Sequence, residues 1–170
     1  GASKLAAEGY GSAFAASYGM QVTALRFSNV YGPRSYRKGS AVAHFFKQML
    51  DGNPITVYGD GSQVRDFVFV ADLCRGILQA IDANVSGAFQ LGSGTPTSIN
   101  KLLVEMKRVV GTKRWSEVRF ADWRAGEVRK TYCDITKARQ AFDFDPATPL
   151  ETGLEATWQW FLQQAASTPR

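Results

Sequence analysis

The sequence predicts an α/β fold in which strands pair in parallel. Short apolar segments alternate along the chain with longer segments of helical periodicity, which is the pattern of β–α–β units. Two of the segments, Val22–Phe27 and Ala88–Leu91, have the character of central parallel strands. Because two central strands are too few for a stable doubly wound sheet, we expect the chain to be part of a larger sheet.

Composition places the chain among globular proteins and narrows its classes of ligand. The 170 residues suffice for one domain or a little more, with a real core. The formal net charge of +5 at pH 7 suits an acidic ligand. The basic residues are scattered, and no run of them interleaves with aromatic residues on one helix face. The composition therefore does not favour a nucleic-acid-binding protein.

The cysteines and the single histidine argue against a metal site. Cys74 and Cys133 are far apart in the sequence and His44 stands alone, so no zinc-binding pattern is present. We interpret His44 as a surface or packing residue. Reduced thiols, with neither a signal peptide nor a bilayer-spanning stretch, indicate a cytoplasmic protein.

The N-terminal part predicts a helix, a strand and a polar loop. Ser3 is a candidate N-cap for a helix over Lys4–Tyr18, and Gly19 follows as its C-terminal glycine. The many alanines and glycines of this helix give it little to bury alone, so it needs a packing partner. The strand Val22–Phe27 leads into the loop Ser28–Arg34, and ligands bind at such carboxyl ends in open α/β sheets.

The middle of the chain predicts a helix, two strands and a second helix. Apolar side chains on one stripe predict the helix Ala41–Leu50. Ile55–Tyr58 alternates as a strand and stops at the turn Gly59-Asp60-Gly61. A short apolar strand over Phe67–Val70 follows, and Asp72 is the expected N-cap of the next helix. The inner face of that helix is expected to be Leu73, Ile77, Leu78 and Ile81.

The C-terminal part continues the alternation. After the strand Ala88–Leu91, Ser98 is expected to cap a strongly periodic helix. Strands are predicted over Val118–Phe120 and Arg129–Cys133, and a short helix over Ile135–Phe142, for which Asp134 is the N-cap. Thr148 and Glu151 form a capping box for the last helix, with Pro149 at its first position. Its apolar stripe is Leu150, Leu154, Trp158, Phe161 and Leu162.

Arg65 is the first residue that suggests chemistry. It stands at the mouth of a buried strand and, across the glycine turn, near the ring of Tyr58. An aromatic ring can stack on a flat base, and a guanidinium can bind phosphate through two hydrogen bonds. These residues indicate a site for an anion attached to a base. The alternative is a hairpin in which Arg65 and Asp66 form an exposed charge pair.

A series of short motifs carries a family resemblance. They are Gly1-Ala2-Ser3-Lys4, Arg26-Phe27-Ser28-Asn29-Val30-Tyr31-Gly32-Pro33-Arg34, Val57-Tyr58-Gly59-Asp60-Gly61, Arg65-Asp66-Phe67, Arg124-Ala125-Gly126-Glu127 and Asp134. In this order and approximate spacing the chain resembles the extended short-chain dehydrogenases/reductases over essentially its whole length. The first motif is similar to the end of their Tyr-x-x-x-Lys signature. The branch it resembles most is the NAD-dependent nucleotide-sugar epimerases/dehydratases, closest to the UDP-glucose 4-epimerase type.

The resemblance implies the C-terminal part of a Rossmann-like doubly wound sheet plus a small α/β substrate-binding subdomain. Residues 1–34 and 71–97 would be a remnant of the NAD-binding domain, and residues 35–70 and 98–170 the nucleotide-sugar-binding subdomain. The sequence contains neither a Gly-x-x-Gly-x-x-Gly loop nor the catalytic tyrosine, so we expect this fragment alone to be inactive. We also expect its N-terminal helix and open sheet edge to form a homodimer or higher oligomer.

Roles around the cofactor follow from the same resemblance. Lys4 would be catalytic, binding the nicotinamide ribose of NAD and lowering the pKa of the catalytic tyrosine. Phe27 and Ser28 would meet the nicotinamide. The ordinary interpretations are a solvated lysine for Lys4 and strand core for Phe27 and Ser28.

The resemblance also implies residues that bind the UDP-sugar. Asn29 would contact the diphosphate, Ser40 and Ala41 the nucleotide through main-chain groups, and Tyr58 the base. Arg65 and Arg124 would grip the diphosphate. Glu127 would lie near the ribose in place of the family's usual aspartate, and its extra methylene moves the carboxylate.

Other functions remain open from the sequence. The chain could be a non-catalytic module that binds nucleotide-diphosphate sugars, or a fragment that folds without binding anything. Within the enzymes, a dTDP-glucose 4,6-dehydratase or a UDP-glucuronate decarboxylase is the neighbouring possibility.

Overall fold

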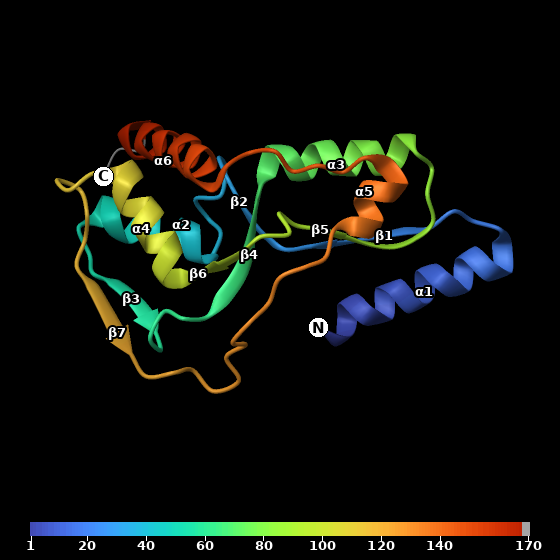
Figure 1. The fold of residues 1–170 in the computed structure, drawn as a ribbon, viewed down its shortest axis with the longest axis horizontal. Helices are drawn as coiled ribbons and strands as arrows, with labels where there is room; N and C mark the ends of the chain where they lie inside the picture. The colour runs from blue at the N-terminus through green and yellow to red at the C-terminus, as the bar shows by residue number, and fades with distance from the viewer. Residues whose placement is uncertain (168–170) are drawn as a thin grey trace.

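A computed structural model describes residues 1–167 of the chain (Figure 1). Its helices and strands follow one another as expected for an α/β protein. In order they are α1 (Ala2–Tyr18), β1 (Thr23–Phe27), β2 (Asn29–Tyr31), α2 (Ala41–Asp51), β3 (Ile55–Tyr58), β4 (Val64–Phe69), α3 (Val70–Asp82), β5 (Gly87–Leu91), β6 (Pro96–Ser98), α4 (Ile99–Val110), β7 (Val118–Ala121), α5 (Thr136–Phe142) and α6 (Leu150–Ser167). Within residues 1–167, no helix is both long and apolar enough to cross a membrane.

The strands form three small sheets, and most of their pairs are parallel. β1 pairs with β5, placing Phe27 opposite Leu91, and β3 pairs with β7, placing Tyr58 opposite Ala121. β4 lies between β2, which is parallel to it, and β6, which is antiparallel. The parallel α/β arrangement predicted from the sequence is confirmed. The hairpin alternative is wrong, because β3 and β4 belong to different sheets.

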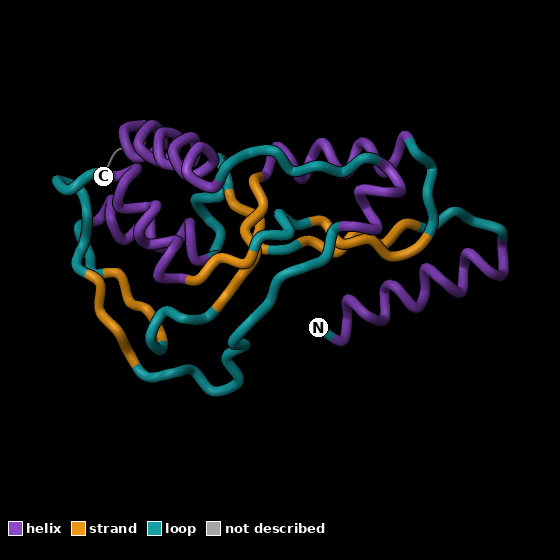
Figure 2. The backbone as a smooth tube through the Cα atoms, in the orientation of Figure 1, coloured by secondary structure: helices purple, strands orange, loops and turns teal. Residues whose placement is uncertain are grey.

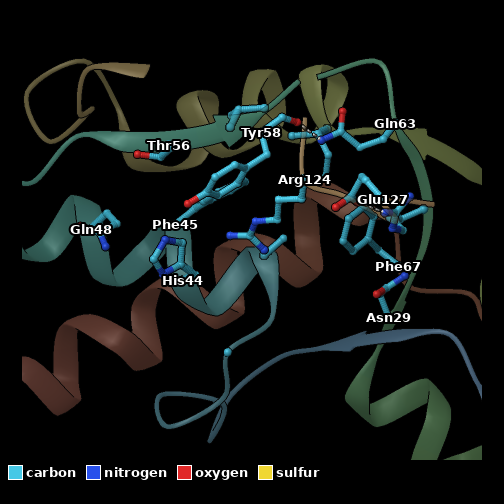
Figure 3. Close-up of a pocket in the computed structure, with 15 residues that line it drawn as sticks. Asn29, His44, Phe45, Gln48, Thr56, Tyr58, Gln63, Phe67, Arg124 and Glu127 are labelled. Atoms are coloured by element: carbon cyan, nitrogen blue, oxygen red, sulfur yellow. Dashed lines mark hydrogen bonds and ion pairs between the residues drawn. The ribbon is translucent and has the colours of Figure 1, made fainter. Parts of the chain in front are cut away.

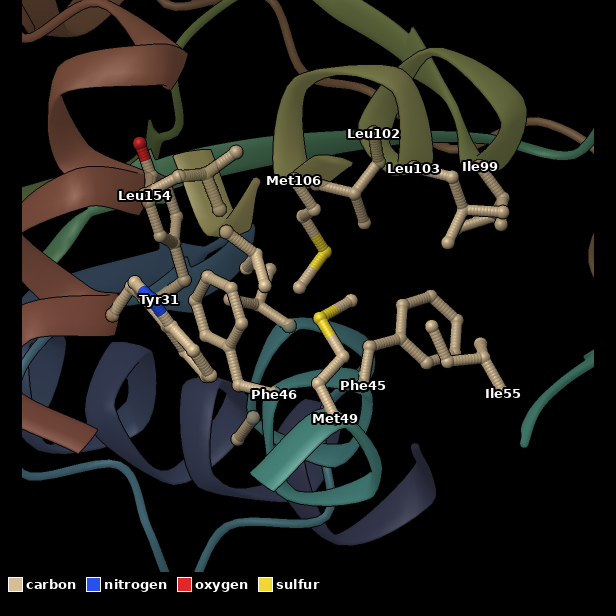
Figure 4. Close-up of a cluster of buried hydrophobic side chains, with 14 of the residues drawn as sticks. Tyr31, Phe45, Phe46, Met49, Ile55, Ile99, Leu102, Leu103, Met106 and Leu154 are labelled. Carbon is tan, nitrogen blue, oxygen red and sulfur yellow. The ribbon is translucent and has the colours of Figure 1, made fainter. Parts of the chain in front are cut away.

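Two hydrophobic cores share strand β4. Alternate residues of a strand point to opposite faces, and here Phe67 enters one core and Val68 the other. The larger core joins α2, α4 and α6 over β3, and Phe46 lies in it against the rings of Trp158 and Phe161 (Figure 4). The smaller core joins α3, β5 and α5 and includes five residues between positions 133 and 144: Cys133, Ile135, Ala138, Phe142 and Phe144.

Helix α1 lies apart from both cores, at the lower right of Figure 1. None of its residues is buried, and only Glu8, Gly11 and Ala15 are half-buried. Glu8 accepts two hydrogen bonds from Arg26 of β1, at 2.8 and 2.6 Å. The helix ends at Gly19 in the left-handed region, as predicted, but Ser3 does not cap it, because the helix already begins at Ala2.

The sequence misplaced several element boundaries. β2 is a three-residue strand inside the segment Ser28–Arg34, which was predicted as a loop, and β6 is a three-residue strand that the sequence did not predict. Arg129–Cys133 is not a strand. Only Lys130 forms a bridge, to Val64, and the chain then turns so that the Cys133 thiol reaches the buried Asp66 carboxylate at 3.2 Å. Figure 2 shows this irregular course between β7 and α5.

Asp72 is not the N-cap of α3 as predicted, and its carboxylate links α3 to the segment before α6. α3 begins earlier, at Val70, and the buried carboxylate of Asp72 accepts from Arg75 at 2.6 Å and from the Thr148 amide at 3.0 Å. The predicted inner face of α3 is also partly wrong, since Leu78 and Ile81 are 61% and 66% exposed. The face that packs contains Leu73, Gly76 and Ala80, with the ring of Phe144 against Gly76.

Among the predicted caps of the C-terminal helices, the cap at Ser98 is confirmed. The Ser98 hydroxyl accepts from the Lys101 amide at 3.1 Å, so Ser98 caps α4 as predicted. Asp134 accepts from the Thr136 amide at 2.8 Å but is not the N-cap as predicted, because α5 begins at Thr136 and Ile135 is its N-cap. α6 begins at Leu150, so Pro149 is not its first residue as predicted, although the Pro149 carbonyl accepts from the Gly153 amide. The Thr148 amide donates to Asp72 and not to Glu151, as the predicted capping box would require. Leu154, Trp158 and Phe161 of its predicted stripe are buried.

Candidate functional site

A cavity of about 550 Å³ lies beside helix α2 and the end of strand β3 (Figure 3). Its wall comes from segments far apart in the sequence: α2, the β3–β4 segment and the loop after β7. The lining residues are Asn29, Gly39, Ala41, His44, Phe45, Gln48, Thr56, Val57, Tyr58, Gln63, Arg65, Phe67, Ile99, Arg124 and Glu127. The structure therefore brings together Asn29, Ala41, Tyr58, Arg65, Arg124 and Glu127, which the sequence singled out separately.

Both arginines that are predicted to bind a diphosphate line this cavity. The Arg124 guanidinium lies over the ring of Tyr58, 3.6 Å from its centroid, a cation–π contact. Arg65 forms a 2.5 Å ion pair with Glu127 and donates to the Val64 carbonyl at 2.8 Å. The Arg65 and Glu127 side chains are only 19% and 22% exposed, so solvent screens this pair incompletely.

The two ends of the cavity differ in charge. His44, Gln48 and Thr56 occupy one end, and Asn29, Gln63 and Glu127 occupy the other, with Tyr58 and Arg124 between them (Figure 3). Burial lowers the pKa of His44 below its ordinary value, and the positive charges of Lys47 and Arg124 lower this pKa further. His44 is therefore neutral at pH 7. The end of the cavity with His44, Gln48 and Thr56 therefore offers uncharged hydrogen-bonding groups. The rest of the cavity is lined by the charged groups of Arg65, Arg124 and Glu127.

The turn between β3 and β4 sets the position of Tyr58 and the residues after it. Gly59 and Gly61 have φ of 79° and 76°, a region that glycine adopts at little cost. Helix α4 holds the turn, because the Asn100 side chain donates to the Asp60 carbonyl and the Asn100 amide donates to the Gly61 carbonyl, both at 3.0 Å. The ring of Tyr58 is thereby presented to the cavity from a fixed backbone.

Buried Asp66 organises the strand that carries Arg65. Its carboxylate accepts from the amides of Ser93 and Gly94 at 2.7 and 3.0 Å, and from the Ser28 hydroxyl at 3.2 Å. Its main-chain carbonyl accepts from the Asn29 side chain at 3.2 Å. Burial, with the neighbouring Asp66 carboxylate, raises the pKa of Cys133 to about 12, so this thiol stays protonated. Asp66 is not the exposed charge considered from the sequence, since it is 0% exposed.

Four predicted site residues do not line the cavity. Lys4 is exposed at the start of α1, and Phe27 is 50% exposed at the carboxyl end of β1. Ser28 donates its hydroxyl to Asp66. Ser40 precedes α2, between the cavity-lining Gly39 and Ala41.

His44, Gln48, Thr56 and Gln63 line the cavity although the sequence did not single them out. His44 and Gln48 are four residues apart on an amphipathic helix, beside its buried stripe. That spacing is the signal that could have identified them.

A comparison with protein families now adds to this geometry. Residues 1–92, more than half of the chain, match the model of the NAD dependent epimerase/dehydratase family. The chain belongs to this family.

Three relatives illustrate the range of epimerase/dehydratase family proteins that this chain resembles. The structure of UDP-glucose 4-epimerase from Thermotoga maritima with UDP-glucose has a TM-score of 0.86 and 36% identity, over 95% of this chain and 52% of that one. UDP-glucuronic acid 4-epimerase from Bacillus cereus, with UDP-glucuronic acid and NAD, has a TM-score of 0.86 and 30% identity, over 94% and 51%. UDP-glucuronic acid decarboxylase 1 of Xenopus tropicalis is 33% identical over 86% of this chain and 34% of its own length. The chain spans about half the length of the two epimerases and 34% of the length of the decarboxylase.

Proposed function

We propose that this chain supplies the nucleotide-sugar-binding part of an NAD-dependent UDP-sugar 4-epimerase. The observation that carries the proposal is the convergence of Arg65, Arg124 and Tyr58 on one cavity. A diphosphate needs cationic donors, a base needs a ring face, and the cavity offers both at adjacent positions. The epimerase structures with UDP-glucose and UDP-glucuronic acid support this choice of ligand.

The charge pattern suggests how the ligand lies. In our proposal the base occupies the neutral end, near Tyr58, His44 and the main chain at Ser40 and Ala41. The diphosphate lies where Arg65, Arg124 and Asn29 can donate to it. Glu127 now neutralises Arg65, so a bound diphosphate would replace this carboxylate as the partner of Arg65 and release Glu127 toward the ribose hydroxyls.

The cofactor would lie on the side of the β1–β5 sheet. In this proposal Phe27, which is exposed at the end of β1, and Ser28 would meet the nicotinamide, and Lys4, which is exposed, would bind its ribose. NAD, when bound, would accept and return the sugar hydride. These 170 residues contain no Gly-x-x-Gly-x-x-Gly loop, so we propose that they alone bind the nucleotide sugar without turning it over.

The domain assignment is part of the same proposal. Residues 1–34 and 71–97 belong to the cofactor-binding part, and residues 35–70 and 98–170 to the nucleotide-sugar-binding part. We also propose that α1, whose Leu5, Tyr10 and Tyr18 are 68%, 69% and 72% exposed, mediates dimerisation. A monomer in sedimentation at micromolar concentration would contradict this assembly.

Calorimetry with UDP and UDP-glucose tests the proposed function. Each of the variants Arg65→Ala and Arg124→Ala should weaken UDP binding about 10- to 100-fold, because each removes charge-assisted hydrogen bonds worth about 1.5–3 kcal/mol. Arg119→Ala is the matched control, since Arg119 pairs with Glu117 on the exposed β7 surface. Equal losses in all three variants would show that only net charge matters. No binding of UDP would contradict the proposal.

The related UDP-glucuronic acid decarboxylase keeps a second chemistry open. A decarboxylase part should prefer UDP-glucuronic acid to UDP-glucose, whereas a UDP-glucose 4-epimerase part should not. Comparing the two ligands, together with dTDP-glucose, separates a UDP-glucose 4-epimerase from the decarboxylase and the dehydratase. A UDP-glucuronic acid 4-epimerase, like the Bacillus cereus relative, would share the preference of the decarboxylase.

A further inference from the structure

A second cavity, of about 450 Å³, lies between strand β6, helix α4 and the segment 146–151 that leads into α6. Helix α4 packs against both β6 and α6 here (Figure 1). The second cavity shares one lining residue, Phe67, with the cavity that holds Arg65 and Arg124. None of the residues assigned above to the nucleotide sugar or the cofactor lines it. Its volume is within the range of small-molecule sites, about 300–1,000 Å³.

Thr97 places an unpartnered hydroxyl in the wall of this second cavity. The residue lies on β6 and is only 4% exposed. Among residues 1–167, its hydroxyl has no hydrogen-bond partner. In the same part of the chain, the unpartnered side-chain atoms that are sealed from solvent belong to Ser40, Gln63 and Gln79. The Thr97 hydroxyl is therefore not sealed off, and it is free to bond a ligand in the cavity.

The first turn of α6 brings main-chain donors to the same cavity. Pro149 lines the cavity directly before the helix, and its carbonyl accepts from the Gly153 amide. The amides of residues 150–152 come before this first bond and have no partner within the helix. No side chain of the described residues accepts from them. Such an uncapped end carries partial positive charge and favours anions.

Charged side chains of α4 complete the wall. Lys101, Glu105 and Arg108 all line the second cavity. Arg108 donates to both carboxylate oxygens of Glu105, at 3.0 and 2.8 Å, so these two charges neutralise each other. The Lys101 ammonium has no ion pair within the part of the chain that the structure describes. Glu151, in the first turn of α6, is also unpaired and is the charge that opposes an anion here.

We propose that the second cavity binds the oxyanion group of a small molecule, a phosphate or a carboxylate. The Lys101 ammonium, the Thr97 hydroxyl and the free amides of α6 would donate to it. An ammonium group and an amide N–H are donors only, and a hydroxyl can donate as well. Their bonds to an anion are charge-assisted and about twice as strong as neutral ones. The inference does not depend on the function proposed above.

The test titrates inorganic phosphate and acetate separately into the unaltered chain and into Thr97→Val and Lys101→Met. Thr97→Val keeps the shape of the side chain and removes its hydroxyl, and Lys101→Met removes the charge. Thr112→Val and Lys113→Met are the matched controls, because both residues are exposed and neither lines the cavity. Backbone amide NMR signals report both the affinity and the place where each anion binds.

In the unaltered chain, phosphate or acetate should shift the signals of β6 and of the first turn of α6. Thr97→Val and Lys101→Met should each weaken this binding by at least about tenfold, the effect of a lost hydrogen bond to a charged group. The two control variants should bind as the unaltered chain does. The stronger of the two anions identifies the ligand group as a phosphate or a carboxylate.

Glu151→Gln should have the opposite effect. It removes the unpaired negative charge from the wall and should tighten anion binding about two- to fivefold. A variant that fails to fold cannot produce such a gain, so this result supports the inference even if Thr97→Val is unstable. Unchanged or weaker binding in Glu151→Gln would contradict it.

Two further outcomes overturn the inference. One is the absence of any response to either anion in the unaltered chain. The other is a response confined to signals of the cavity around Tyr58 and Arg124 that Thr97→Val and Lys101→Met leave unchanged. Neither outcome affects the proposed function, which depends on UDP binding at that other cavity.

Discussion

The cavity region and helix α1 are built in opposite ways. The cavity lies against the larger core, to which α2, β3, α4 and α6 each contribute buried side chains. α1 buries no residue and is joined to β1 by the exposed pair of Glu8 and Arg26. Exposed ion pairs contribute little to stability. The side chains that line the cavity are therefore held by packing against a buried core. The position of α1 is not fixed by such packing.

Phe46→Ala should show this difference most strongly. Phe46 is 0% exposed and packs on Trp158 and Phe161 at centroid distances of 5.1 and 5.6 Å. Removing a buried phenyl ring leaves a cavity and should lower the free energy of unfolding by about 3–5 kcal/mol. Phe14→Ala in α1 is the matched control, since Phe14 is 49% exposed, and it should have a much smaller effect. Urea denaturation measures both, and comparable losses would mean that α1 shares the stability of the core.

Asp66→Asn should have the next largest effect and should act on the site as well. An asparagine cannot accept from the Ser93 and Gly94 amides with both of its terminal atoms, so one buried donor loses its partner. The free energy of unfolding should fall by about 2–3 kcal/mol. UDP affinity should fall too, because Asp66 orders the strand that carries Arg65.

The control for this variant is Asp60→Asn, an exposed carboxylate that accepts from the Ser62 amide at 2.9 Å. It should leave stability and UDP affinity nearly unchanged. If Asp66→Asn kept full UDP affinity, Asp66 would be a folding residue with no influence on the cavity.

The smallest effect concerns His44 and sharpens the electrostatic side of the comparison. The pKa of His44 is lowered, so just below pH 6.5 the unfolded chain binds more protons at this residue than the folded chain. The contribution of His44 to stability is thus present above its ordinary pKa of about 6.5 and is lost as the pH falls through the lowered value. His44 is the only histidine, so one imidazole NMR signal reports this pKa.

Arg124→Ala should raise the pKa of His44 toward its ordinary value, because it removes one of the positive charges that lower it. Arg119→Ala should leave this pKa unchanged. An identical titration curve in the Arg124 variant would show that burial and Lys47 suffice.

The sequence predicted the elements whose side chains repeat with a clear period. The stripes of α2, α4 and α6, the cap at Ser98 and the strands β1, β3 and β5 follow from local pattern. The three-residue strands β2 and β6 have no period long enough to detect, and their pairing with β4 is a tertiary event. Leu78 and Ile81 look like core residues in sequence, but α3 packs through Gly76, which an apolar pattern does not highlight.

The candidate site shows the same division. Arg65 and Tyr58 were singled out from the strand and turn around them and Arg124 from a family motif, and the cavity that joins them depends on the parallel pairing of β3 with β7. The exposure of Asp66 was misjudged for a similar reason, since its donors come from Ser28, Ser93 and Cys133, remote in the chain.

The register of β3 and β7 has a practical consequence for redesign. Tyr58 faces Ala121 across the pair, and the amide of Val64 bonds the Arg129 carbonyl at 2.8 Å. The segment 122–128 is anchored at both ends by main-chain bonds and contributes nothing to either core. We expect an exchange of this segment between relatives to change the side chains that it presents to the cavity, among them Arg124 and Glu127.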